Sequence, residues 1–167
     1  MLPALQMVAL LALPGAADAG TPRLERLEAM PAVEQALRPH GRPLLVHFWA
    51  LWCEPCRDEL PQQVELARKA KAAGIDVVHV NLDPFGQEPA VRAHLLGLKA
   101  LDLARTFQLL PELQSEKVSQ LLDPAWKGGI PATFGFSASG ALVISLHRPL
   151  GHSGAKKVLR ALAPRPK

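Results

Sequence analysis

Cys53 and Cys56 are the only two cysteines in the 167-residue chain, and two residues separate them. The apolar run Leu44–Trp49 predicts a strand before the pair and a helical pattern follows it, so both cysteines should lie where a helix begins. The unpaired N–H groups of a helix start stabilise a thiolate. We therefore expect an exposed Cys53 to attack disulfides and a buried Cys56 to resolve the mixed disulfide. The reactive group would be the Cys53–Cys56 disulfide, with no other cofactor.

The surrounding sequence predicts an α/β domain that positions this pair. A strand that is apolar on both faces, such as Leu44–Trp49, is typical of a sheet covered by helices on both sides. Hydrophobic periodicity predicts a second strand over Ile75–Leu82 and a hairpin of Ala132–Phe136 with Ala141–Leu146. Helices are expected over Thr21–Leu37, from the cysteines to Gly74, over Pro89–Leu98, Leu101–Leu109 and Glu112–Leu122, and from Ser153 onward.

Two blocks of this sequence resemble a known family. Residues 44–61 place Phe48-Trp49-Ala50-Leu51-Trp52 before Cys-Glu-Pro-Cys and a proline after it, and residues 129–134 read Gly-Ile-Pro-Ala-Thr-Phe. The combination resembles the thioredoxin superfamily, and more narrowly the extracytoplasmic TlpA/ResA-type thiol-disulfide oxidoreductases. The resemblance covers roughly residues 40–162. It implies a thioredoxin-like fold, a central mixed β-sheet flanked by helices, with a mostly helical insertion before the cis-proline loop.

The resemblance also implies roles for individual residues. In this fold the proline equivalent to Pro131 is cis and packs against the disulfide, which leaves the backbone at Ile130 free to pair with an extended substrate. An acid equivalent to Glu59 assists the buried thiol, and burial there would raise the pKa of the carboxyl. The alternative is that Glu59 only solvates the helix. Further contacts to the substrate are expected from the residues next to the cysteines, Trp52, Glu54 and Pro55.

Two histidines lie on the predicted strands. His47 occupies the position where thioredoxin keeps a buried Asp that accepts a proton from the second cysteine. It could carry a proton beneath the disulfide, but a neutral core histidine with one hydrogen bond is the interpretation we favour. We expect His79 to be structural.

The insertion, residues 83–128, separates Cys53 from Pro131 more widely than in a minimal thioredoxin. It could cap one edge of the sheet, or it could shape the groove where a partner docks. The sequence leaves both alternatives open.

Residues 1–19 are expected to be a secretory signal peptide, followed by the thioredoxin-like domain over 20–167. The apolar run Leu2–Leu13 is too short to span a bilayer, and Ala17-Asp18-Ala19 offers a cleavage site. No Lys or Arg precedes the run, so an uncleaved membrane anchor is the alternative. Either interpretation predicts a periplasmic or otherwise extracytoplasmic location.

Composition and cysteine usage narrow the function. The net charge of +4 is mild and the basic residues are scattered, which argues against nucleic-acid binding. The Trp-Cys-x-x-Cys arrangement favours disulfide exchange over a peroxidase, and no second ligand pair for zinc is visible. We expect protein thiols and disulfides as substrates, reduction rather than oxidation, and an upstream membrane thiol-disulfide electron donor. The alternative is a periplasmic copper-binding or copper-delivery protein that uses Cys53, Cys56 and either His79 or His94.

Overall fold

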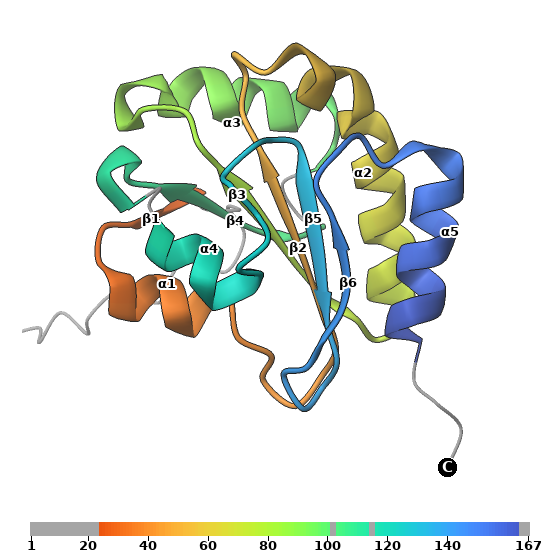
Figure 1. Cartoon of the computed structure of the whole chain (residues 1–167). Helices are drawn as coiled ribbons and strands as arrows, with labels where there is room; N and C mark the ends of the chain where they lie inside the picture. The colour runs from red at the N-terminus through yellow and green to blue at the C-terminus, as the bar shows by residue number, and fades with distance from the viewer. Residues whose placement is uncertain (1–23, 101–102, 114–115, 164–167) are drawn as a thin grey trace, which may run out of the picture.

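A six-stranded mixed sheet forms the centre of the computed structural model, which describes residues 24–100, 103–113 and 116–163 (Figure 1). The expected signal peptide, residues 1–19, lies outside the described residues. The strand order is β1-β4-β3-β2-β5-β6. Strands β1, β4, β3 and β2 run parallel to one another, whereas β5 is antiparallel to β2 and to β6. The strands are β1 Leu24–Leu27, β2 Leu44–Trp49, β3 Asp76–Asn81, β4 Arg105–Leu109, β5 Ala132–Phe136 and β6 Leu142–Leu146.

Helices cover both faces of this sheet, with α2 and α5 on one face and α1 and α4 on the other (Figure 1). All six residues of β2 are buried, as expected for a strand covered on both sides. The expected central mixed sheet flanked by helices is thereby confirmed. The helices are α1 Met30–Ala36, α2 Glu54–Ala72, α3 Glu88–Gly97, α4 Glu116–Leu122 and α5 Gly151–Leu162, with short 3-10 turns at Phe85–Gln87 and Pro111–Leu113.

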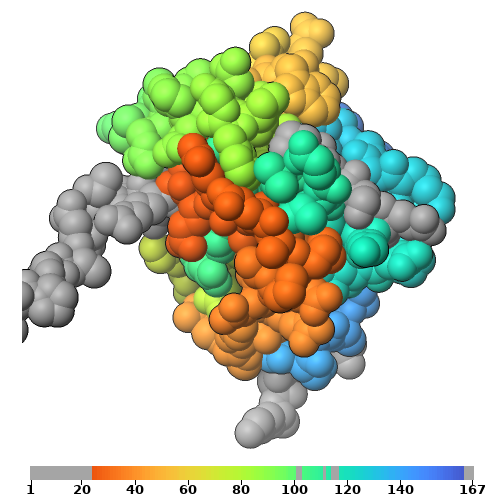
Figure 2. Space-filling view, turned by 90° about the vertical axis from the view of Figure 1, so that its left-hand side faces the viewer, coloured from red at the N-terminus to blue at the C-terminus, as the bar shows by residue number. Residues whose placement is uncertain are grey.

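The N-terminal region differs from the expected single helix over Thr21–Leu37. Within its described part, strand β1 pairs with β4, and α1 starts separately at Met30. Pro31 lies in the first turn of α1, where its missing N–H costs no hydrogen bond, and it would interrupt a helix arriving from upstream. Figure 2 shows this N-terminal segment, in orange, lying against α3 and α4. The predicted helix was therefore wrong over its first half.

The insertion contains a strand as well as helices. The helix expected over Leu101–Leu109 is wrong, because Arg105–Leu109 forms β4 between β1 and β3. Its residues from Thr106 to Leu109 are all buried, and pairing on both edges outweighs the weak helical spacing of the apolar residues. Helix α3 confirms the stretch expected at Pro89–Leu98, and α4 forms only the last part of the helix expected at Glu112–Leu122. In the described residues no helix is long and apolar enough to cross a membrane.

Candidate active site

The two cysteines lie at the junction of β2 and α2, as the sequence predicts. Cys53 is the N-cap of α2, and its Sγ accepts a hydrogen bond from the N–H of Cys56 at 3.2 Å. The two sulfurs form a disulfide across a Cα–Cα distance of 5.2 Å. Cys53 is 6% exposed and Cys56 is fully buried. The expected order of exposure is correct, but in this disulfide state Cys53 is not an exposed residue.

The loop before β5, 77 residues further along the chain, covers Cys53. The Ile130–Pro131 peptide bond is cis, and the carbonyl oxygen of Ile130 lies 3.8 Å from Sγ of Cys53. Pro131 is buried and Ile130 is half-buried. Antiparallel pairing of β5 with β2 brings this loop to the cysteines, because Ala132 stands opposite Phe48. The structure thus places the predicted loop residues beside the disulfide.

Trp126 holds this loop, although the sequence did not single it out. Its indole N–H donates to the carbonyl of Gly129 at 2.7 Å. Its ring packs on Phe48 and Phe134, with centroid distances of 4.8 and 5.1 Å. The signal in the sequence that could have indicated this role was a lone tryptophan shortly before Gly-Ile-Pro.

Asp83 anchors the turn before Cys53 and was also missed. Its Oδ2 accepts the N–H of Leu51 and the side-chain amide of Asn81, both at 2.7 Å. Arg57 closes the other side of the turn by donating to the carbonyl of Leu51 at 2.9 Å. An aspartate directly after a parallel strand, at the edge where β2 also ends, was the signal for this role.

The surface around the disulfide is formed by the three residues expected to contact the substrate. The indole of Trp52 is 62% exposed, a large apolar group next to Cys53. Glu54 and Pro55 are exposed in the first turn of α2. All three are therefore accessible to a partner next to the cysteines in the chain.

Glu59 is buried one turn beyond Cys56, so it does not simply solvate the helix. Its carboxyl is 5% exposed and accepts hydrogen bonds from the backbone N–H of Leu150 and from Nε2 of Gln63, the latter at 3.3 Å. Burial raises the pKa of this carboxyl above its ordinary value, and the two hydrogen bonds oppose that shift. The group is therefore a candidate proton carrier, buried three residues after Cys56 on the same helix.

His47 lies beneath Glu59 on β2. Its Nδ1 is 3.1 Å from Oγ1 of Thr133, and its Nε2 is 3.6 Å from Oε1 of Glu59. Burial, together with the neighbouring His79, lowers the pKa of His47 well below its ordinary value. Burial also lowers the pKa of His79 to about 4. Both imidazoles are therefore neutral core groups at neutral pH, as expected.

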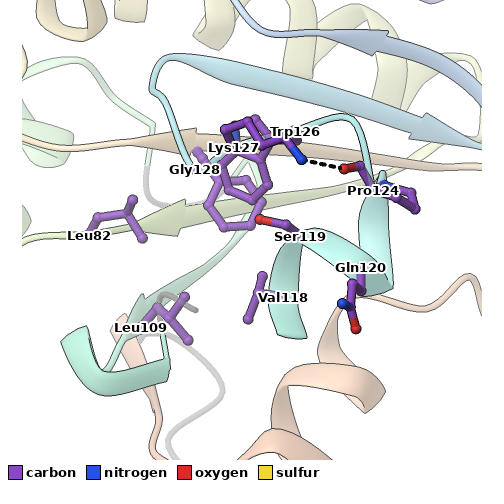
Figure 3. Close-up of a pocket in the computed structure, with 10 residues that line it drawn as sticks. Leu82, Leu109, Val118, Ser119, Gln120, Pro124, Trp126, Lys127 and Gly128 are labelled. Carbon is purple, nitrogen blue, oxygen red and sulfur yellow. Dashed lines mark hydrogen bonds between the residues drawn. The ribbon is translucent and has the colours of Figure 1, made fainter. Parts of the chain in front are cut away.

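A pocket of about 530 Å³ opens next to the loop that carries Ile130 (Figure 3). Its apolar lining comes from the strand ends and from the insertion, namely Phe48, Leu82, Leu109, Val118 and Trp126. Ser119 and Lys127 add polar groups. Figure 3 shows Leu82, Leu109 and Val118 gathered around the Trp126 indole. The lining extends to Gly128, two residues before Ile130, whereas neither cysteine lines the pocket.

The copper alternative finds no support in the structure. It required His79 or His94 to join Cys53 and Cys56 as ligands. Among the described residues, no three His, Cys, Asp or Glu side chains are grouped to hold a metal ion. His79 instead contacts His47, with a centroid distance of 5.9 Å, and His94 lies near Trp49 at 6.1 Å.

Residues 31–143 match the AhpC/TSA family, and this segment includes both cysteines and the Ile130–Pro131 loop. The chain belongs to this family. Among related sequences, thiol-disulfide oxidoreductase ResA of Geobacillus thermodenitrificans is 23% identical over 74% of the chain and 65% of the relative. ResA of Oceanobacillus iheyensis is 40% identical over 26% of the chain and 22% of the relative. The chain thus spans less than two thirds of the length of these curated relatives.

Solved structures show the same fold. A structure described as a putative thiol:disulfide interchange protein DsbE from Chlorobium tepidum is 27% identical, with a TM-score of 0.54 over 73% of this chain and 81% of that one. A secreted thiol-disulfide isomerase from Corynebacterium glutamicum gives a TM-score of 0.57 at 18% identity, over 75% of this chain and 71% of that one.

Proposed function

We propose that this protein is a thiol-disulfide oxidoreductase that exchanges disulfides with other proteins through Cys53 and Cys56. The observation that carries the proposal is the disulfide at the start of α2, with Sγ of Cys53 against the Ile130 carbonyl. A helix start favours a thiolate, which is the nucleophile in thiol-disulfide exchange. The related proteins named thiol-disulfide oxidoreductase support the same activity.

In the reducing direction the thiolate of Cys53 attacks one sulfur of a substrate disulfide. The substrate S–S bond breaks, its electron pair leaves on the other substrate sulfur, and a mixed disulfide with Cys53 forms. Cys56 then loses its proton to Glu59 and attacks Sγ of Cys53. The second substrate sulfur leaves as a thiolate and the Cys53–Cys56 disulfide remains. A thiol partner must reduce this disulfide for the next turnover.

We assign the protein a reductive role outside the cytoplasm. The isoleucine before Pro131 and the resemblance to TlpA/ResA-type proteins favour reduction over oxidation. The apolar run and Ala-x-Ala sequence within residues 1–19 favour export, with membrane anchoring if this segment stays attached. A membrane thiol-disulfide protein on the same side would then supply the electrons.

The substrate is a polypeptide rather than a small disulfide. The backbone just before Pro131 lies beside Cys53, and the resemblance to thioredoxin-like proteins implies that it pairs there with an extended chain. The adjoining pocket would receive an aliphatic or aromatic side chain of that chain, because its lining is largely apolar. This would give the insertion a role in shaping the docking groove.

Substitution of each cysteine tests the function. Cys53→Ser should abolish turnover of a protein disulfide, whereas Cys56→Ser should accumulate a mixed disulfide through Cys53, detected by mass spectrometry of the non-reduced complex. Equilibration of the wild-type protein with glutathione gives its reduction potential. Undiminished turnover by Cys53→Ser would refute the proposed function, and a potential near the oxidising end of the known range, about −120 mV, would refute the reductive direction.

A further inference from the structure

Four buried polar side chains close a ring beneath the disulfide, and the proposed function uses only one of them. Starting from Glu59, Oε1 is 3.3 Å from Nε2 of Gln63, which is 3.4 Å from Oγ1 of Thr133. The hydroxyl of Thr133 is 3.1 Å from Nδ1 of His47. Nε2 of His47 completes the ring at 3.6 Å from Oε1 of Glu59. All four residues are 5% exposed or less.

The surroundings of His47 favour one tautomer. Nδ1 lies 3.1 Å from the hydroxyl oxygen of Thr133, which can accept its hydrogen, whereas Nε2 has no hydrogen-bond partner among the described residues. A neutral imidazole with its hydrogen on Nδ1 presents a bare lone pair at Nε2. That lone pair faces Glu59.

The neighbours of Glu59 assign the position of its own proton. Oε2 faces the N–H of Leu150, and Oε1 faces the amide N–H of Gln63, so both partners are donors. A protonated carboxyl also needs an acceptor, and Nε2 of His47, 3.6 Å from Oε1 and itself without a hydrogen-bond partner among the described residues, can serve. The distance of 3.6 Å exceeds a hydrogen bond, so a small shift of the carboxyl accompanies protonation.

We propose that the neutral imidazole of His47 accepts the acid proton of Glu59 through Nε2 and so positions this carboxyl as the proton store for Cys56. His47 is a positioning residue that acts through Glu59. This inference rests on the proposed function, and it replaces the purely structural role favoured for His47 from the sequence. The other titratable groups nearby are His79 on β3 and Cys56 on α2, while Leu150, the residue before α5, contributes its backbone N–H.

The stored proton is used when the disulfide is reduced. A thiolate of the electron donor attacks Sγ of Cys53, the Cys53–Cys56 bond breaks, and its electron pair goes to Sγ of Cys56. The proton then moves from Glu59 to that sulfur. The resulting carboxylate keeps its hydrogen bonds from Leu150 and Gln63. Oxidation by a substrate returns the proton to Glu59.

Nuclear magnetic resonance of the oxidised protein tests this inference without any substrate. ¹⁵N shifts of His47 should show the hydrogen on Nδ1 and a bare Nε2 at a pH where Glu59 is protonated. ¹³C titration of Glu59 should give a pKa lower by about one unit in His47→Leu, the equivalent of one lost hydrogen bond. His47→Gln keeps an acceptor oxygen and should restore part of the shift.

Two outcomes would overturn the inference. The first is a hydrogen on Nε2 of His47 in the wild-type protein while Glu59 is protonated, a measurement that needs no variant to fold. The second is an unchanged Glu59 titration in folded His47→Leu. Neither outcome affects the cysteine tests, so failure here is distinguishable from failure of the proposed function. The pH dependence of disulfide exchange should move with the Glu59 titration in the same variants.

Discussion

Strands β2 and β5 build two different environments on the two faces of the sheet. Toward α2, His47 and Thr133 join Glu59 and Gln63 in a polar ring. Toward α4, the next residues in each strand, Phe48 and Phe134, pack around Trp126. Successive side chains of a strand point to opposite faces, so residues one position apart in each strand belong to the two different environments. Two neighbouring strands therefore contribute to a polar cluster on one face and to an aromatic cluster on the other.

The disulfide lies at the end of β2, where the two environments meet. The polar face carries the carboxyl that we propose as the proton store for Cys56, and the apolar face holds the loop that carries Ile130. Substitutions on the apolar face should therefore change stability and the use of protein substrates. Substitutions on the polar face should instead change pH dependence.

The largest effect is expected from Phe134→Ala on the apolar face. Phe134 is fully buried between Phe48 and Trp126, so truncation should lower the free energy of unfolding by about 3–5 kcal/mol. Chemical denaturation measures the loss, and Phe85→Ala, at a half-buried position, is the control with a smaller expected loss. A shifted pH profile of exchange in Phe134→Ala would show that the two faces are not separable.

A smaller, pH-dependent effect is expected from His79→Leu on the polar face. The unfolded chain binds a proton at His79 near pH 6.5, but the folded protein does so only near pH 4. The free energy of unfolding therefore decreases progressively as the pH falls from 6.5 to about 4, by up to about 3 kcal/mol in total. His79→Leu should flatten this acid loss in denaturation curves, whereas His152→Leu, at an exposed position, should not. Equal acid sensitivity of wild type and His79→Leu would contradict the assignment.

The smallest effect, on substrate choice alone, is expected from filling the pocket. Ser119→Phe should lower kcat/KM for a protein disulfide by about tenfold, because one apolar side chain of the substrate loses its place. Turnover of a small aromatic disulfide should stay unchanged. Ser139→Phe, in the exposed turn between β5 and β6, is the control. A parallel fall for both substrates would remove the pocket from the docking surface.

The sequence by itself determined the core of the site. The predicted bounds of Leu44–Trp49 and Ala132–Phe136 coincide with β2 and β5, and the expected junction of strand and helix holds both cysteines. These signals are local: an apolar run of strand length, a cysteine pair at a helix start and a Gly-Ile-Pro loop. Local signals of this kind need no knowledge of distant partners.

Tertiary structure decided the outer strands. Neither β1 nor β4 has a strong local pattern, since exposed Glu25 and Arg26 interrupt the first and Gln108 breaks the apolar run of the second. The two strands pair with each other, and β4 also pairs with β3, so ladder hydrogen bonds across the sheet stabilise them. Sequence spacing favoured helices here because it does not contain these partners.

Tertiary structure also decided which polar residues share the site. Thr133 is 86 residues from His47 and 70 from Gln63, and no local pattern relates them. The register of β2 with β5 places Thr133 opposite His47, and packing of α2 on that face brings Glu59 above both. The polar residue types of this cluster could be read from the sequence. The four side chains meet only because strand register and helix packing bring them into one small buried volume, where a polar group must find its partners among its protein neighbours.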